Sequence, residues 1–168
     1  MKGFILEKYM IEQMKKNIYF PSLKFIFQDL YFLNKDFNWL ITDCECNPEK
    51  KEYFDLFNFN FNETLWITGE KLSRIVIESD FQWIWASLSG FKKDVKEEDV
   101  LKYKRPYARD NPVFWQNPVS IQHPLAEVEL VPWDGMHLLF IIKNNKYANI
   151  FYEKFPLAKD LETYNRLL

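Results

Sequence analysis

The sequence predicts one α+β domain over residues 1–168, built on a mainly antiparallel sheet with a C-terminal hairpin and flanking helices. Three observations favour this fold. Asp134-Gly135 separates two apolar runs, and Asp-Gly suits the type I′ hairpin turn, in which both central residues take positive φ. Short apolar segments typical of strands recur along the chain. Segments with apolar residues at helical spacing lie between and after them.

The first 43 residues read as two helices and a strand. Apolar residues interrupted by charges predict a helix over 3–16, and Pro21 ends that pattern. A second helix is predicted over 22–34, with Ser22 as its N-cap. Residues 36–43 alternate between apolar and polar side chains, as in a strand.

The next fifty residues alternate between irregular and regular patterns. The acidic, Asn- and Phe-rich region 49–63 has no clean period and is interpreted as a loop with room for one helical turn. Residues 65–67 predict a short strand, and Thr68 caps a helix that ends near Glu78. The aromatic and apolar run 81–88 predicts a central strand.

Residues 91–125, here called the flap, are charged at first and then rich in proline. Proline removes a backbone donor and biases its predecessor toward extended backbone, so a long irregular excursion is predicted. Ordered loops of this length are usually functional or packed against the surface.

The C-terminal part contains the hairpin and two helical patterns. With Asp134-Gly135 as a two-residue turn, Val131 would oppose Leu138 and Glu129 would oppose Phe140. Both faces of this hairpin are largely apolar, which places it in a sheet that is covered. Helices are predicted over 146–155 and 158–167.

Composition is that of an ordinary globular domain, with 48% hydrophobic and 27% charged residues. The two cysteines, Cys44 and Cys46, are poorly placed for a mutual bridge in a regular strand, so a reducing compartment is favoured. The N-terminal apolar run is broken by charges, unlike a secretory leader, and no run is long enough to cross a membrane. We therefore expect a cytoplasmic protein with no membrane partner.

Charge is unevenly distributed along the chain. Residues 43–91 carry nine acidic and four basic side chains, whereas residues 92–109 carry four acidic and seven basic ones. The acidic stretch would repel nucleic acid and attract a basic partner. The alternative is a set of solvated faces whose charges mix once the chain is folded.

Candidate acid–base groups are few. The two histidines, His123 and His137, fit structural or surface positions better than catalysis. The strand pairs Glu127 with Glu129 and Asp43 with Glu45 would suit acid–base chemistry only inside a pocket. The four glycines are isolated, which argues against a phosphate-binding loop.

Metal and nucleic-acid sites are also disfavoured. The cysteines and histidines lack zinc-ligand spacing, so no metal is expected. The basic and aromatic residues between Lys102 and Arg109 could contact phosphates and bases, but overall acidity counts against nucleic-acid binding. Within the flap, Phe114 and Trp115 lie on an irregular segment, where large aromatics form either a packed lid or a binding anchor.

Four runs together, 80–90, 106–115, 122–134 and 155–165, are similar to small bacterial proteins that sit beside polymorphic toxin genes and are regarded as immunity proteins. Residues 66–91 also resemble a Bacillus family of unknown function. The resemblance covers roughly residues 37–165. Family members often carry Asp-Ser-Ser where this chain has Asp134-Gly135-Met136, so a role of those hydroxyls does not transfer.

The resemblance implies a cytoplasmic immunity protein that binds and neutralises a cognate toxin, with no catalysis and no cofactor. An acidic face suits a basic nuclease toxin, because it competes with nucleic acid for the same groove. The predicted contact residues are Asp43, Glu45, Glu49, Glu52, Phe114 and Trp115. The alternatives are a structural or regulatory protein-binding domain, and a small hydrolase that uses buried carboxylates or a histidine.

Overall fold

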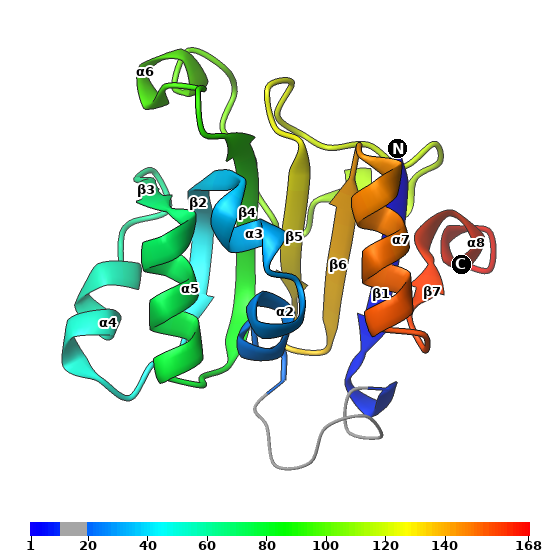
Figure 1. Cartoon of the computed structure of the whole chain (residues 1–168), viewed down its shortest axis with the longest axis horizontal. Helices are drawn as coiled ribbons and strands as arrows, with labels where there is room; N and C mark the ends of the chain where they lie inside the picture. The colour runs from blue at the N-terminus through cyan, green and yellow to red at the C-terminus, as the bar shows by residue number, and fades with distance from the viewer. Residues whose placement is uncertain (11–19) are drawn as a thin grey trace.

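The computed structural model describes residues 1–10 and 20–168, and it centres on one seven-stranded sheet (Figure 1). The strand order is β3-β2-β4-β5-β6-β1-β7, and each neighbouring pair is antiparallel. The strands are β1 Lys2–Glu7, β2 Phe37–Cys46, β3 Leu65–Thr68, β4 Trp83–Lys92, β5 Val128–Trp133, β6 His137–Ile142 and β7 Lys159–Asp160. The predicted α+β class is therefore confirmed.

Helices α2, α3, α5 and α7 lie on one face of this sheet, as Figure 1 shows. The helices are α2 Lys24–Asp29, α3 Phe32–Lys35, α4 Lys51–Phe57, α5 Gly69–Glu78, α6 Glu97–Val100, α7 Asn145–Lys154 and α8 Leu161–Asn165, with a 3₁₀ helix η1 at Pro112–Trp115. In the described part of the chain, every helix is too short or too polar to cross a membrane.

The main core lies between the sheet and these helices. Alternate residues of the strands, such as Phe4, Leu6 and Phe140, point into it. Phe151 of α7 stacks on Phe140 with ring centroids 4.2 Å apart and planes 5° apart. Burial of such large rings supplies much of the driving force for folding.

The flap covers the opposite face of the sheet. Phe114 and Val119 of the flap pack with Ile5, Val131 and Ile141 of the strands in a second core. Apart from the end of β4, α6 and η1, the segment is irregular, as its prolines predict. Because both faces of the sheet are covered, both faces of the hairpin are apolar.

The predicted helix over 3–16 is wrong at its start, because residues 2–7 form β1 between β6 and β7. Phe4 and Leu6 face the helices while Ile5 faces the flap, so all three are buried. A strand buried on both faces has no period-2 alternation to identify it. Residues 8–10 are helical, and the prediction for residues 11–16 lies outside the described residues.

The hairpin turn is of the predicted kind, but its register is shifted by one residue. Asp134 and Gly135 have φ values of 50° and 62°, and Met136 N donates to Trp133 O at 3.0 Å. Met136 is an extra loop residue, so His137 opposes Trp133 and Val131 opposes Leu139. Likewise Glu129 opposes Ile141 rather than Phe140. Nothing in the all-apolar pattern distinguished the two registers.

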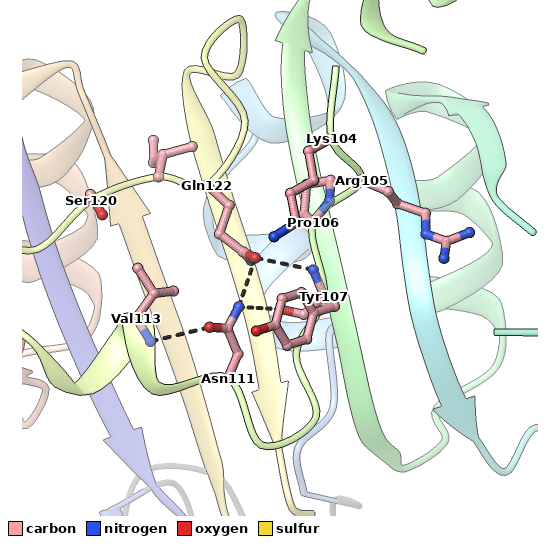
Figure 2. A pocket seen from close by; sticks show the side chains of 9 residues that line it. Lys104, Arg105, Pro106, Tyr107, Asn111, Val113, Ser120 and Gln122 are labelled. Carbon is pink, nitrogen blue, oxygen red and sulfur yellow. Dashed lines mark hydrogen bonds between the residues drawn. The ribbon is translucent and has the colours of Figure 1, made fainter. Parts of the chain in front are cut away.

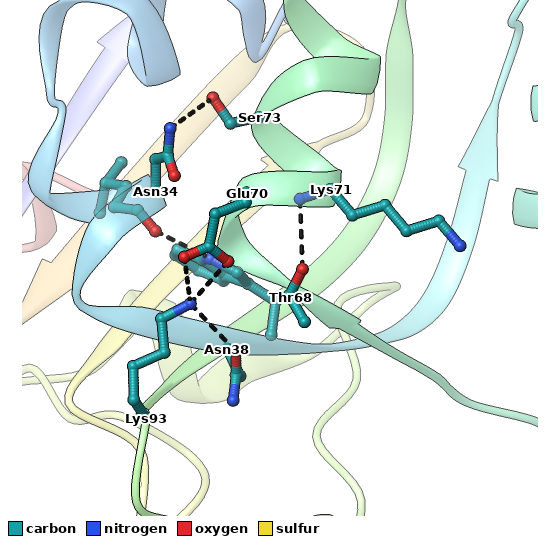
Figure 3. Close-up of polar contacts among 9 residues, drawn as sticks. Asn34, Asn38, Thr68, Glu70, Lys71, Ser73 and Lys93 are labelled. Atoms are coloured by element: carbon teal, nitrogen blue, oxygen red, sulfur yellow. Dashed lines mark hydrogen bonds and ion pairs between the residues drawn. The ribbon is translucent and has the colours of Figure 1, made fainter.

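The start of α5 is built as predicted and ties three elements together (Figure 3). Thr68 Oγ1 accepts a hydrogen bond from Lys71 N at 3.2 Å, which satisfies a helix N-terminal donor. Glu70 in the first turn pairs with Lys93, which follows β4, at 2.8 Å.

The remaining elements are close to their predicted positions. The strand predicted over 36–43 continues to Cys46, and the strand over 81–88 is found at 83–92. Region 49–63 contains the two-turn helix α4. The helix over 22–34 is split into α2 and α3. The prediction of Ser22 as N-cap is wrong, because Leu23 holds that position, although Ser22 Oγ accepts a hydrogen bond from Lys24 N at 3.1 Å. The helix over 146–155 is confirmed as α7, whereas the segment 158–167 begins as β7 and ends as α8.

Candidate functional site

Asp43 fastens the flap to β2. It lies at a bulge with φ 48°, a left-handed conformation that Asp tolerates better than most residues. Its Oδ2 accepts hydrogen bonds from Ala108 N at 2.9 Å and Arg109 N at 2.6 Å. Thr42 Oγ1 donates to Pro106 O at 2.9 Å, which adds a second link to the same part of the flap.

Glu129 of β5 is a fully buried carboxyl beneath the flap. It accepts hydrogen bonds from Ser87 Oγ at 2.9 Å, Gln122 Nε2 at 2.6 Å and Gln122 N at 3.1 Å. Burial raises the pKa of Glu129 to about 7, although these hydrogen bonds favour the charged form. The flap therefore closes over a group that titrates near neutral pH.

The bonds continue from Gln122 into a cavity of about 290 Å³ (Figure 2). Gln122 Oε1 accepts from Tyr107 N at 3.1 Å and from Asn111 Nδ2 at 2.7 Å. Asn111 Nδ2 also donates to Tyr107 O at 2.9 Å, and its Oδ1 accepts from Val113 N at 3.1 Å. The side-chain amides of Gln122 and Asn111 thus fix the conformation of the flap where it covers Glu129.

Four half-buried aromatics form a continuous row on the flap side of the sheet. This aromatic row consists of Trp85 on β4, Trp133 on β5, Trp115 on η1 and Tyr164 on α8. The ring centroid of Trp133 is 4.9 Å from that of Trp85 and 5.0 Å from that of Trp115, and both pairs of rings meet edge to face. Trp115 is 6.2 Å from Tyr164. Elements distant in sequence therefore present one apolar strip.

Each end of the aromatic row carries an ion pair. Arg109 lies over Trp85 at 5.9 Å and pairs with Glu45, and both charged side chains are nearly half exposed. Lys159 lies 5.6 Å over Tyr164 and pairs with Glu7 at 2.6 Å. The row is thus an apolar centre with a charged rim, the usual anatomy of a protein interface.

Two of the six predicted contact residues are enclosed in this conformation. Asp43 is 4% exposed and Phe114 is 1% exposed. Asp43 is turned inward because its carboxylate holds the flap backbone, and Phe114 packs edge to face on Trp133 at 5.8 Å. Placing these two on the contact surface is therefore corrected: both hold the flap in position.

The other four predicted residues lie at or near the surface. Glu45 and Trp115 lie at two points of the aromatic row. Glu49, before α4, and Glu52, in its first turn, are exposed. The structure thus connects Glu45 with Trp115 through Arg109 and the tryptophans, although they are distant in sequence.

His123 is held by hydrogen bonds to the backbone, whereas His137 is half-buried with its ring 6.3 Å from that of Trp115. His123 Nε2 donates to Val100 O at 3.1 Å and its Nδ1 accepts from Leu125 N at 3.2 Å, which defines a neutral ring. Burial lowers the pKa of His123 and of the half-buried His137. The ring nitrogens of His123 are fully used by the backbone, so it is not free to act as a base.

The basic cluster of the flap is engaged in local contacts. Lys102 pairs with Asp99 at 2.6 Å, and Arg109 pairs with Glu45. The side chains of Lys104 and Arg105 lie over aromatic rings, those of Tyr107 at 6.0 Å and Phe61 at 5.4 Å. Within residues 1–10 and 20–168, no three His, Cys, Asp or Glu side chains gather as metal ligands would.

Sequence reasoning missed the partners that make these sites. Trp83 is buried in the main core, whereas Trp85 and Trp133 are partly buried against the second core and belong to the aromatic row. The available signal was period 2: Glu129 and Trp133 lie four residues apart and face the same side of β5. The carboxyl of Glu129 therefore had to lie on the same face of β5 as Trp133, which indicates a polar site on that face.

Comparison with family models, with curated proteins and with solved structures finds no match to this chain. Function must therefore be argued from the site.

Proposed function

We propose that this chain is a cytoplasmic immunity protein that binds a cognate bacterial toxin and neutralises it by covering the toxin's active surface. The observation that carries this proposal is the aromatic row. Trp, Tyr and Arg are the residues that most often dominate binding energy at protein interfaces; the row contains Trp and Tyr, and Arg109 lies at one end of it.

The row is suited to binding because it is already ordered. Its rings belong to β4, β5, η1 and α8, so little conformational entropy is lost when a partner covers them. The role requires a rigid surface and no catalytic group. Neutralisation follows if the covered part of the toxin includes its active groove.

Charge near Glu45 supports a basic partner. Glu45 is nearly half exposed at the end of the row, and Glu49 and Glu52 are exposed further along the chain. Acidic groups beside an aromatic anchor speed the encounter with a basic protein, such as a nuclease toxin. Ion pairing of Glu45 with Arg109 reduces this effect, so the aromatic contacts are assigned most of the affinity.

Co-expression tests the proposal directly. The tagged protein is expressed with the product of a toxin gene adjacent to its own, and both growth and complex formation are measured. The expected result is a stoichiometric complex together with rescue of growth. Growth arrest without a complex would contradict the proposal.

Point variants test the surface. Trp115→Ala should weaken the complex by roughly 30-fold, the effect of losing about 2 kcal/mol at a binding anchor. Tyr31→Ala is the matched control, because Tyr31 is 68% exposed and lies in the chain between α2 and α3, away from the elements of the aromatic row. Equal losses from both variants would remove the aromatic row from the interface.

Charge reversal tests the acidic component. Changing Glu45, Glu49 and Glu52 to Lys should mainly slow association, with a loss that shrinks at high salt. Reversal of the exposed Glu97 and Glu98 on α6 is the control. Unchanged association after the first set would exclude the acidic stretch from the contact.

The alternative binding role uses the same surface with a different partner. A structural or regulatory domain would bind through the aromatic row without protecting cells from a toxin. A complex that forms without rescue of growth would favour that role.

A hydrolase role has one supporting feature, the raised pKa of Glu129, which suits a general acid or base near neutral pH. The carboxyl is fully buried beneath the flap and bonded to Ser87 and Gln122. Catalysis would therefore require the flap to open.

A further inference from the structure

Cys44 and Cys46 form a close pair of free thiols in β2. Their sulfur atoms are 3.9 Å apart, and both residues are partly buried against the main core. Asp43 precedes the pair and Glu45 separates its members. The two thiols therefore alternate with the two carboxylates that bind Arg109.

A bulge brings the sulfur atoms together. In a regular strand, residues two apart are separated by about 6.6 Å, near the upper limit for a disulfide. Here the register with β4 shifts between Thr42 and Glu45, and again between Glu45 and Cys46. A bulge bends the strand, so the regular geometry that disfavours a bridge does not apply.

We propose that the Cys44–Cys46 pair is an oxidation site at which hydrogen peroxide closes an intramolecular disulfide. One thiol is oxidised by peroxide to a sulfenic acid, and one water molecule is released. The second thiol attacks the sulfenic sulfur, the sulfur–sulfur bond forms and a second water leaves. Two thiols and one peroxide thus give one disulfide and two waters.

The surroundings of Cys44 disfavour its thiolate form. The hydrogen bond to Cys46, burial, and the nearby carboxylates of Asp43 and Glu45 raise the pKa of Cys44. A thiol with a raised pKa holds little thiolate at neutral pH and reacts slowly with peroxide.

Closing the bridge would affect the flap. The backbone N–H of Arg109 donates to the carboxylate of Asp43, and the guanidinium of Arg109 pairs with Glu45. A bridge between the sulfur atoms would change the backbone conformation of residues 44–46. Asp43 directly precedes this segment and Glu45 lies within it, so both carboxylates would move. We expect the Arg109 contacts to weaken and the flap to loosen, whatever partner the aromatic row binds.

Mass spectrometry of the full chain tests the chemistry. After one equivalent of hydrogen peroxide, the monomer should lose the mass of two hydrogen atoms, and both thiols should stop reacting with maleimide together. A thiol reductant should restore both. Addition of oxygen to either sulfur, or a disulfide-linked dimer, would overturn the proposal.

Two single variants test the sulfenic-acid route. In Cys44→Ser, the Cys46 sulfenic acid should persist and be trapped by dimedone. In Cys46→Ser, dimedone should likewise trap the sulfenic acid that forms at Cys44. Disulfide formation in the unsubstituted chain with no trapping in either variant would contradict the sulfenic-acid route. Folding of each variant is checked by its near-ultraviolet circular dichroism.

Limited proteolysis tests the coupling to the flap. Oxidation should raise cleavage within the flap by about tenfold, as expected when the equivalent of one hydrogen bond to a charged group is lost. The same peroxide treatment of Cys46→Ser is the control and should leave cleavage unchanged. A disulfide that forms without altering cleavage would refute the coupling.

Discussion

Gln122 gives both its backbone N–H and its side-chain amide to the carboxyl group of Glu129, at 3.1 Å and 2.6 Å. One flap residue is thus bound twice by one buried acid of β5. The third donor is the hydroxyl of Ser87, so all three hydrogen bonds come from neutral groups. Neutral donors compensate burial of a charge only in part, which is why burial prevails and the pKa is raised.

Replacing Glu129 with Gln should make stability less dependent on pH. The pKa of Glu129 is about 7 in the folded chain against an ordinary 4.5, so the folded state keeps a proton that the unfolded state releases between those values. This lowers the free energy of unfolding as pH rises through that window, by on the order of 3 kcal/mol, and the effect levels off above it. Urea denaturation of both proteins between pH 5 and about 8 measures the difference.

The direction of the change identifies the group. Glu129→Gln should gain stability relative to the unsubstituted chain as pH rises, even if the new amide costs a constant amount at every pH. Glu127→Gln is the control, because Glu127 is partly exposed and lies 3.7 Å from Lys143. Parallel pH profiles for the Glu129→Gln variant and the unsubstituted chain would contradict this role.

Replacing Asp43 with Ala should release the flap. Two flap amides would lose their shared acceptor, and Ala would occupy a left-handed backbone position. We expect a loss of roughly 2–4 kcal/mol in the free energy of unfolding. Hydrogen exchange at the amides of Ala108 and Arg109 should accelerate most.

Asp43→Asn separates the two causes. Asn tolerates left-handed backbone and keeps one acceptor oxygen, so this variant should lose less stability than Asp43→Ala. If the Ala108 and Arg109 amides remain protected in Asp43→Ala, the carboxylate is not the anchor of the flap.

Replacing Gly69 with Ala should destabilise the chain, although Ala usually strengthens a helix. A Cβ at Gly69 would lie 2.9 Å from Leu33 O and closer still to the carbonyl oxygens of Asn34 and Phe37. The clash should cost roughly 1–3 kcal/mol, measured by denaturation. Lys71→Ala on the exposed side of the same helix is the control and should change stability little. A stabilised Gly69→Ala variant would show that α5 can shift away from α3.

Local chemistry allowed much of the fold to be predicted. Thr68 as a cap, Asp134-Gly135 as a turn and the prolines of the flap each act through their own backbone, so the sequence alone identifies them. The strand at residues 2–7 was not predicted, because pairing with β6 and β7 decides its conformation. The extra loop residue Met136 was not predicted, because either hairpin register buries apolar side chains.

The site was harder to predict than the fold. Glu45 and Trp115 were identified from charge and from an aromatic on an irregular segment, and these are local signals. That the aromatic row joins them depends on which strands are neighbours, and adjacency of β4 and β5 cannot be read from either strand alone. The exposure of Phe114 and Asp43 was misjudged for the same reason, since the flap's docking on the sheet encloses both.

The position of β1 between β6 and β7 also sets the order in which this chain can fold. Lys2 pairs with Ile142 and Phe4 pairs with Asp160, so β1 can find its neighbours only after the distant strands β6 and β7 have been synthesised. Contacts across such long sequence separations require a costly loop closure and slow the folding reaction. Until then the segment Phe4-Ile-Leu6, which is buried in the native sheet, remains uncovered and prone to aggregation. Folding of this half of the sheet therefore waits for β6 and β7, and we expect its yield to depend on temperature, on protein concentration and on chaperones.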